Sequence, residues 1–178
     1  MKFFPAQKTG QKHSLENAFD QFYPRLYRYF RLRGATIEEA KDLASTTFEK
    51  ALLHFSSYDS NKGEIQTWLF AIAHNLSINH WKMETVHSSD PIDDDLPDLE
   101  TGELEMEIIR QEKKEAVLQA LQTLDSRARQ IIALKFAGPL TNRQISHLLG
   151  ISEQNVAVII YRSLLKLRKI LTENEVNP

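Results

Sequence analysis

The sequence predicts an all-α fold of two small helical domains joined by an acidic flexible linker, with a helix-turn-helix in the second domain. Apolar residues recur every three or four positions over most of the chain, which is the period of an amphipathic helix. The 6 glycines and 6 prolines are few and lie mostly at the edges of these blocks. A sandwich or barrel, which needs many turns, is therefore disfavoured. The periodicity is lost in an acidic stretch near the middle of the 178 residues, so the chain divides into two halves.

Composition excludes several classes of protein. Apolar residues make up 42% and charged residues 26%, so a disordered or fibrous chain is ruled out. There are 0 cysteines, which excludes disulfides, thiolate metal sites and a cysteine nucleophile. No apolar run approaches the roughly 18 residues of a membrane-spanning helix. The first residues also lack the apolar segment of a secretory signal.

Charge is distributed unevenly along the chain. The net charge of −2 divides into +2 over residues 1–86, −9 over 87–109 and +5 over 110–178. Two mildly basic blocks therefore flank an acidic segment. A near-neutral total argues against nucleic-acid binding, and this blockwise count removes that objection without proving the opposite.

The first half predicts three helices. Ser14 is a candidate cap for the first, Pro24 inside it predicts a kink or break, and Gly34 ends it. Thr36 and Glu39 form a capping box for the second helix. This half continues as a helix to about Phe55, a polar loop over 54–64 and a helix from about Ile65 to Met83.

The second half predicts a helix-rich domain after an extended linker. Two prolines, many aspartates and no periodicity mark the linker. Asp125 is a plausible cap for a helix through Phe136, and Thr141 with Gln144 forms a second capping box. Gly150 ends the short helix that follows. The predicted organisation is a flexible N-terminus over 1–13, a first domain over 14–86, a linker over 87–102 and a second domain over 103–178, with Ser152 capping a last helix to about Leu171.

The segment 140–162 has the spacing of a helix-turn-helix, in which a first short helix braces a second that enters the major groove. Glutamine and asparagine side chains can pair with adenine, and small apolar groups can contact a thymine methyl. The alternative is an ordinary helical hairpin with a solvated basic face. The residues facing outward early in the second helix are Glu153, Gln154, Asn155, Ala157, Val158, Tyr161 and Arg162. Basic side chains nearby that could hold phosphates include Arg127, Arg129, Arg143 and Lys166.

The segment 65–82 combines an apolar face with polar and aromatic groups late in a helix. Trp68, Ile72 and Leu76 are interpreted as core, whereas Asn75 and Asn79 are polar. Such a mixture can stack on unpaired bases and hydrogen-bond to them. The alternative is an amphipathic helix with an exposed tryptophan, which is common in proteins without such a function.

Sites for catalysis or metal binding are weakly supported. His74, His80 and His87 are spaced by six and seven residues, unlike the i, i+4 pair of a helical zinc site. The aspartates at 90–95 lack the glycine and terminal glutamate of a calcium loop. We therefore expect no metal, no cofactor and no enzyme activity.

Three blocks of the sequence resemble the extracytoplasmic-function (ECF) sigma factors, the promoter-specificity subunits of bacterial RNA polymerase. The block EEAKDLASTTFEKAL at 38–52 resembles the family's Asp-Leu-x-Gln-x-x-Phe helix. The block at 63–82, GEIQTWLFAIAHNLSINHWK, resembles its Trp-Leu-x-x-Ile-Ala-x-Asn helix. The third runs from ALQTLDSRARQIIALKF into LTNRQISHLLGISEQNVAVIIYRSLLKLR. The order and spacing of the three together are specific, and the resemblance covers about residues 15–83 and 104–171.

The resemblance implies a cytoplasmic protein without catalytic activity of its own, which partners core polymerase and promoter DNA and is controlled by a separate anti-sigma factor. The first domain would dock on the clamp helices of the largest polymerase subunit and melt the −10 element. The second would bind the polymerase flap and recognise the −35 element. The implied core-binding residues are Asp42, Ser45, Thr46 and Glu49. The implied −10 residues are Tyr58, Asn61, Lys62, Asn75, Asn79 and His80. The implied −35 residues are Asn142, Arg143, Ser152, Glu153, Gln154, Asn155, Ala157, Val158, Tyr161 and Arg162.

Four positions depart from the family pattern. Ser45 replaces a frequent glutamine, and His74 stands where a basic residue often precedes the asparagine. Ala157 and Ile159 replace frequent lysine or arginine, so the recognition helix is unusually apolar. Phosphate contacts then come from elsewhere, or this face also serves a protein partner. Two other classes remain open: a stand-alone helix-turn-helix regulator, and a helical adaptor without DNA contact.

Overall fold

The computed structural model describes residues 9–83 and 104–176, and all regular structure in these ranges is helical. The all-α prediction is confirmed for this part of the chain. The linker predicted over 87–102 lies outside the described residues, as do residues 1–8 of the predicted flexible N-terminus. None of the helices described is both long enough and apolar enough to cross a membrane.

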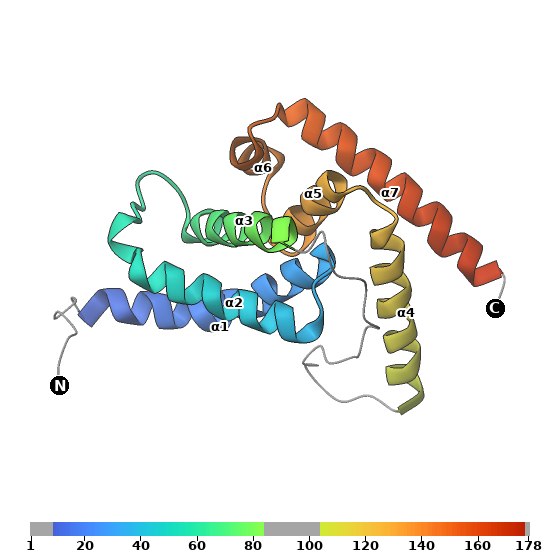
Figure 1. Ribbon diagram of the computed structural model, residues 1–178, viewed down its shortest axis with the longest axis horizontal. Helices are drawn as coiled ribbons and strands as arrows, with labels where there is room; N and C mark the ends of the chain where they lie inside the picture. The colour runs from blue at the N-terminus through green and yellow to red at the C-terminus, as the bar shows by residue number, and fades with distance from the viewer. Residues whose placement is uncertain (1–8, 84–103, 177–178) are drawn as a thin grey trace.

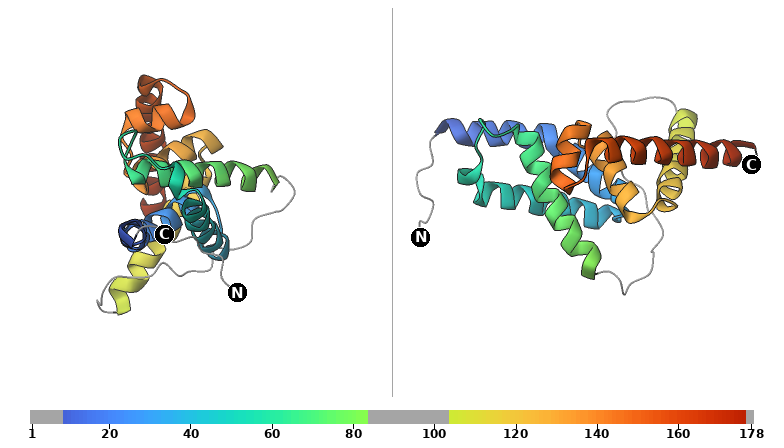
Figure 2. Two further views of the ribbon diagram at one scale, coloured as in Figure 1. Left: turned by 90° about the vertical axis from the view of Figure 1, so that its left-hand side faces the viewer. Right: turned by 90° about the horizontal axis from the view of Figure 1, so that it is seen from above.

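The first half consists of α1 (Thr9–Arg33), α2 (Ile37–Leu53), the 3₁₀ turn η1 (Phe55–Ser57) and α3 (Ile65–Met83). Helices α1 and α2 pack side by side, and α3 crosses them at an angle (Figures 1 and 2). Large side chains from all three helices are buried together, among them Leu26, Tyr29, Phe30, Phe48 and Phe70. Burial of this apolar surface holds the three helices in place.

Helix α1 differs from the prediction in two respects. Ser14 lies inside the helix instead of capping it, because the helix begins at Thr9. Pro24 also lies inside it and does not break it. Proline removes one helical hydrogen bond, but Phe22 and Leu26 on either side are buried in the core. Their packing holds the helix together across the missing bond.

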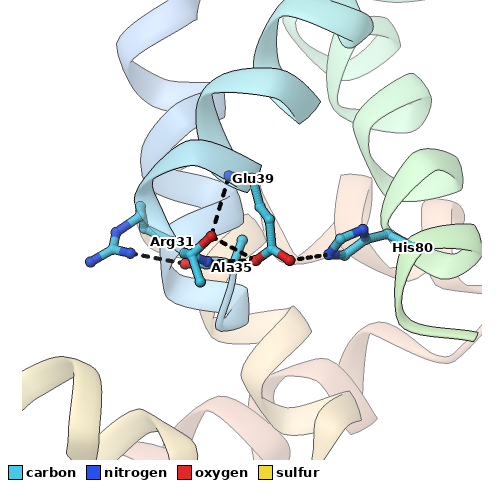
Figure 3. A network of polar contacts seen from close by, with 5 residues as sticks. Arg31, Ala35, Glu39 and His80 are labelled. Carbon is cyan, nitrogen blue, oxygen red and sulfur yellow. Dashed lines mark hydrogen bonds and ion pairs between the residues drawn. The ribbon is translucent and has the colours of Figure 1, made fainter. Parts of the chain in front are cut away.

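The predicted caps of the later helices are confirmed. Thr36 accepts a hydrogen bond from the Glu39 amide while the Glu39 carboxylate accepts one from the Thr36 amide, which is the complete capping box. The other oxygen of Glu39 lies 3.6 Å from Nε2 of His80 (Figure 3). One carboxylate therefore caps α2 and also ties it to the end of α3.

The second half consists of α4 (Leu104–Gln122), α5 (Ser126–Phe136), α6 (Asn142–Leu149) and α7 (Glu153–Val176). Asp125 caps α5, and Thr141 with Gln144 forms the capping box of α6. Helix α7 continues five residues beyond the predicted end at Leu171 and extends away from the molecule (Figure 1).

The two halves share one hydrophobic core. Ile131, Leu134 and Leu140 of the second half are buried with Phe30 and Phe70 of the first. A smaller cluster joins α4, α5 and α7 around Leu121, Ile132 and Leu167. The structure is therefore a closed arrangement in which α5 packs against α1 (Figure 1). The sequence predicts two helical units but gives no indication that they pack together.

Candidate nucleic-acid interface

A pocket of about 310 Å³ opens between the end of α2, η1 and the middle of α3. Asn75 and Asn79 lie one helical turn apart on α3, so both amides fall on the same face, and both side chains are exposed. The complete lining is Lys50, His54, Ser57, Trp68, Ile72, Asn75, Leu76 and Asn79.

The apolar wall of this pocket is braced by an aromatic cluster. Trp68 lies with its ring centroid 5.3 Å from that of Tyr58 and 6.1 Å from that of Phe55. These contacts hold η1 and the following loop against α3. The prediction that Trp68, Ile72 and Leu76 are core is therefore only partly right, because they are half-buried and line the pocket. A flat apolar wall beside exposed amides suits a planar, hydrogen-bonding ligand such as an unpaired base.

The structure brings only some of the predicted −10 residues together. Asn75 and Asn79 line the pocket, whereas Tyr58 supports Trp68 from outside the lining. Asn61 and Lys62 lie in the exposed loop. The backbone N–H of Asn61 donates to the Asp59 carboxylate, and the Lys62 ammonium lies 3.7 Å from the same carboxylate. His80 faces Glu39 instead of the pocket.

Two lining residues were not predicted from the sequence. Lys50 and His54 are exposed and lie one helical turn apart at the end of α2. Their spacing is visible in the sequence, but their position opposite Asn75 depends on how α2 packs against α3. They add a positive charge and an imidazole to the lining of the pocket.

The other side of α3 is buried against the second half of the chain. His74 is only 9% exposed, and its Nδ1 contacts the side-chain amide nitrogen of Gln130 on α5. Burial lowers the pKa of His74, and the nearby charge of Arg33 lowers it further. Arg33 places its guanidinium 4.7 Å from the centre of the Trp81 ring and donates to the Ser126 carbonyl at 2.7 Å. Helix α3 therefore presents the pocket on one face and the contact between the halves on another.

The residues predicted to dock on polymerase lie on one face of α2. Asp42, Ser45 and Glu49 are exposed, and Thr46 is half-buried. Positions separated by three, four and seven residues share a helix face. Phe48 is 4% exposed and belongs to the core. The exposed face carries two carboxylates beside small hydroxyl side chains, which suits a basic partner surface.

Helices α6 and α7 have the predicted helix-turn-helix arrangement. Gly150 ends α6 with a φ of 65°, the left-handed conformation that glycine adopts most readily. Ser152 begins α7 by accepting from the Asn155 amide at 3.2 Å. Ile145 and Val156 are fully buried between the two helices and the core. The second helix is thus braced from behind.

The predicted −35 surface is largely accessible. Arg143 is exposed on α6, and Asn142 is half-buried with its side-chain oxygen unpaired. Ile159 is half-buried against the core, so its apolar character has a packing role. The exposed residues early in α7 are Ser152, Glu153, Gln154, Asn155, Ala157, Val158, Tyr161 and Arg162.

Two of the basic side chains considered for phosphate contacts hydrogen-bond within the protein. The guanidinium of Arg129 donates to the carbonyls of Leu121 and Leu124 at the end of α4, both at 3.1 Å. Lys166 donates to the Thr123 carbonyl. These side chains hydrogen-bond to carbonyls at and just after the end of α4, so they stabilise the second half. Arg162, by contrast, is exposed, as a phosphate contact requires.

Among the residues that the structure describes, no three histidine, aspartate or glutamate side chains are grouped so that they could hold a metal ion.

Comparison with known proteins identifies both halves. Residues 18–85 match Sigma-70 region 2, and residues 114–167 match Sigma-70 region 4. The chain is 29% identical to RNA polymerase sigma factor YlaC of Bacillus subtilis over 92% of this chain and 95% of that protein. It is 25% identical to ECF RNA polymerase sigma factor SigM of Bacillus subtilis over 88% of this chain and 94% of that protein.

The fold is also similar to a solved structure. The sigma factor RpoE of Bartonella quintana, in a co-crystal with the anti-sigma factor NepR, aligns with a TM-score of 0.70 at 17% identity, covering 89% of this chain and 97% of that one. At 17% sequence identity, this structural similarity shows that the two chains share a fold and nothing more. Together with the two matched regions and the curated relatives, the comparisons show that the chain belongs to the extracytoplasmic-function sigma factors, which direct RNA polymerase to promoters.

Proposed function

We propose that this sigma factor divides promoter recognition between its two halves. Residues 14–86 bind core polymerase and melt the −10 element, and residues 103–178 recognise the −35 element, with 87–102 as the connection. The pocket beside Asn75 and Asn79 is the observation that carries this assignment. It lies on the half that matches region 2, and the helix-turn-helix lies on the half that matches region 4.

In the −10 role, the pocket holds one unstacked base of the non-template strand. The volume of about 310 Å³ lies in the range of small-ligand sites. Trp68 provides a stacking surface, and the amides of Asn75 and Asn79 provide donors and acceptors for the base edge. Lys50 also lines the pocket, and its positive charge attracts the phosphate of the same nucleotide. Tyr58 acts indirectly by holding Trp68 in position.

In the −35 role, α7 enters the major groove with its first turns. Gln154 and Asn155 are exposed and suited to bidentate contacts with adenine. Val158 is 44% exposed and suited to a thymine methyl. Arg143 and Arg162 hold phosphates on either side. The protein supplies specificity and carries out no catalysis of its own.

The partners follow from the same surfaces. Core polymerase binds the face of α2 that carries Asp42, Ser45, Thr46 and Glu49, and the flap binds the second half. A separate anti-sigma factor controls the protein in the cytoplasm. This last proposal is supported by the fold likeness to a sigma factor solved with its anti-sigma factor.

Binding to core polymerase tests the assignment to region 2 directly. We expect the double substitution Asp42→Ala with Glu49→Ala to weaken copurification with core, because it removes both exposed carboxylates from the face. Glu38→Ala is the matched control, since Glu38 is an exposed carboxylate in the first turn of the same helix. Equal retention of core by both variants would place the docking surface elsewhere. Failure of the wild-type protein to bind core at all would favour a stand-alone DNA-binding regulator.

A further inference from the structure

The contact between the two halves contains a buried histidine that the proposed function does not use. His74 points from α3 toward α5 and is 9% exposed. Its Nδ1 contacts the side-chain nitrogen of Gln130. An amide nitrogen only donates, so the contact is a hydrogen bond only when Nδ1 carries no proton. The neutral form of His74 therefore fits this interface.

The surroundings of His74 disfavour its charged form. Tyr29 and Arg33 approach from α1, and Arg129 lies beyond Arg33 on α5. Glu39 on α2 is paired with His80, farther along α3. In the part of the chain that the structure describes, no ion pair brings a carboxylate to His74. An imidazolium there would face one nearby guanidinium and the donor side of an amide.

Rotation of the Gln130 amide does not easily relieve this conflict. The Tyr29 hydroxyl interacts with Gln130 as well as with Ser77, whose oxygen lies 3.3 Å away. Ser77 donates its own proton to the His74 carbonyl at 2.7 Å, so Tyr29 donates to Ser77 and accepts from Gln130. Turning the amide to offer its oxygen to a protonated His74 would therefore remove the donor that faces the Tyr29 oxygen. Because buried polar groups are costly when left unpaired, the whole cluster favours a single protonation state.

We propose that His74 is a proton-sensitive latch: in its neutral form it holds α5 against α3, and on protonation it releases the second half of the chain from the first. The latch is a property of the free chain and does not depend on the proposed promoter contacts. Its consequence for function is that the pocket on α3 and the recognition helix α7 become free to change their separation.

The direction of the pH dependence follows from linkage. Burial and Arg33 lower the pKa of His74 in the closed arrangement. In an open arrangement the exposed imidazole returns to about 6.5. The open form then binds a proton more readily than the closed form, so acid favours opening. The free energy by which neutral His74 favours the closed form is fully present above about pH 6.5. It is lost as the pH falls below that value.

Two other contacts between the halves do not depend on pH. Gln66 donates to the Gly138 carbonyl at 2.7 Å, and Gln144 donates to the Thr67 hydroxyl at 2.9 Å. None of these four groups titrates near neutral pH. The ion pair between His80 and Glu39 joins two helices of the first half.

The separation of the two halves is the direct readout. The chain has 0 cysteines, so two introduced cysteines can be spin-labelled specifically. Glu38 on α2 and Glu173 on α7 are suitable positions, with side chains 80% and 64% exposed. Pulsed electron–electron double resonance on the full chain gives the distribution of distances between the two labels at about pH 7.5 and about pH 5.5. We expect one narrow distance at the higher pH and a second, longer and broader population at the lower pH.

Two substitutions should abolish acid opening for opposite reasons. His74→Gln keeps an acceptor for Gln130 but cannot be protonated, so the narrow distance should persist at both pH values. Gln130→Glu gives a protonated His74 a carboxylate partner, so acid should no longer open the chain. His147→Gln is the control, because His147 is an exposed histidine on α6. It should open in acid as the wild type does.

Circular dichroism at both pH values separates opening from unfolding. An unchanged distance distribution in the wild type, with helices intact, would overturn the latch. Acid opening that persists in His74→Gln would overturn it too, since another group would then be responsible. Loss of helical signal at about pH 5.5 in the wild type would show acid unfolding in place of domain release, and would contradict it as well.

Discussion

Gln144 donates a hydrogen bond from its side-chain nitrogen to the hydroxyl of Thr67, 2.9 Å away, while its side-chain oxygen completes the capping box of α6. One side chain thus starts the helix-turn-helix and ties it to the first turn of α3. The helix that carries the pocket and the helices proposed to recognise the −35 element are linked through this residue.

The two roles of Gln144 can be separated by substitution. Gln144→Ala removes the side-chain contribution of Gln144 to the capping box and the link to Thr67, and we expect it to lower the free energy of unfolding by about 1–2.5 kcal/mol. Thr67→Val removes only the link and should cost about 0.5–1.5 kcal/mol. Urea unfolding of both variants measures the difference. Equal losses would mean that the capping box contributes nothing to stability.

Gly138, two residues after α5, lies against Phe70 of the first half. A Cβ placed there would lie 2.7 Å from the Leu134 carbonyl oxygen and 3.1 Å from the Phe70 ring. Gly138→Ala should therefore destabilise the protein by about 1–3 kcal/mol. Gly63→Ala is the control, because nothing lies within 4 Å of its Cβ position. A Gly138→Ala variant as stable as Gly63→Ala in thermal unfolding would show that the Leu134 carbonyl and the Phe70 ring do not crowd this position in solution.

The −35 proposal predicts a base-specific loss. Changing Gln154 or Asn155 to alanine should cost about 1–3 kcal/mol at particular base pairs if each makes a bidentate contact. Arg162→Ala should instead weaken binding to all sequences and reduce its salt dependence, as expected for a phosphate contact. A scan of promoter mutations with the polymerase complex distinguishes these outcomes. Unaltered base preference in both Gln154→Ala and Asn155→Ala would refute the −35 assignment.

The −10 proposal predicts a defect in melting. Asn75→Ala with Asn79→Ala leaves the pocket without both exposed amides, so open-complex formation should fall while binding to core polymerase is retained. Permanganate footprinting of unpaired thymines measures the melted region. Glu64→Ala is the control, since Glu64 is exposed just before α3. A bubble of normal extent and yield in the double variant would exclude these amides from the −10 site.

Local patterns made much of the fold predictable. Thr36 with Glu39, Asp125, and Thr141 with Gln144 all cap the helices that the sequence assigns to them, because capping depends on residues only a few positions apart. Of the kink or break predicted at Pro24, the break is wrong, because the packing of Phe22 and Leu26 in the core overrides a local preference.

Contacts between helices that are distant in the sequence were not predictable in the same way. Nothing in the sequence indicates that His74 lies against Gln130, or that Lys50 faces Asn75 across a pocket. Both relationships depend on how amphipathic helices pack, and periodicity identifies the buried face without identifying what covers it. Arg129 shows the same limit, because a basic side chain that looks free in the sequence caps the end of α4.

Transcription by a reconstituted polymerase tests the central claim most directly. Core polymerase would be supplied with this protein on genomic DNA, and the 5′ ends of the transcripts would be sequenced and compared with those made by core alone. We predict a set of new, defined start sites that share two upstream sequence elements, with the same sites lost when Asn75 and Asn79 are both alanine. Identical transcripts with and without the protein would contradict its function as a promoter-directing sigma factor.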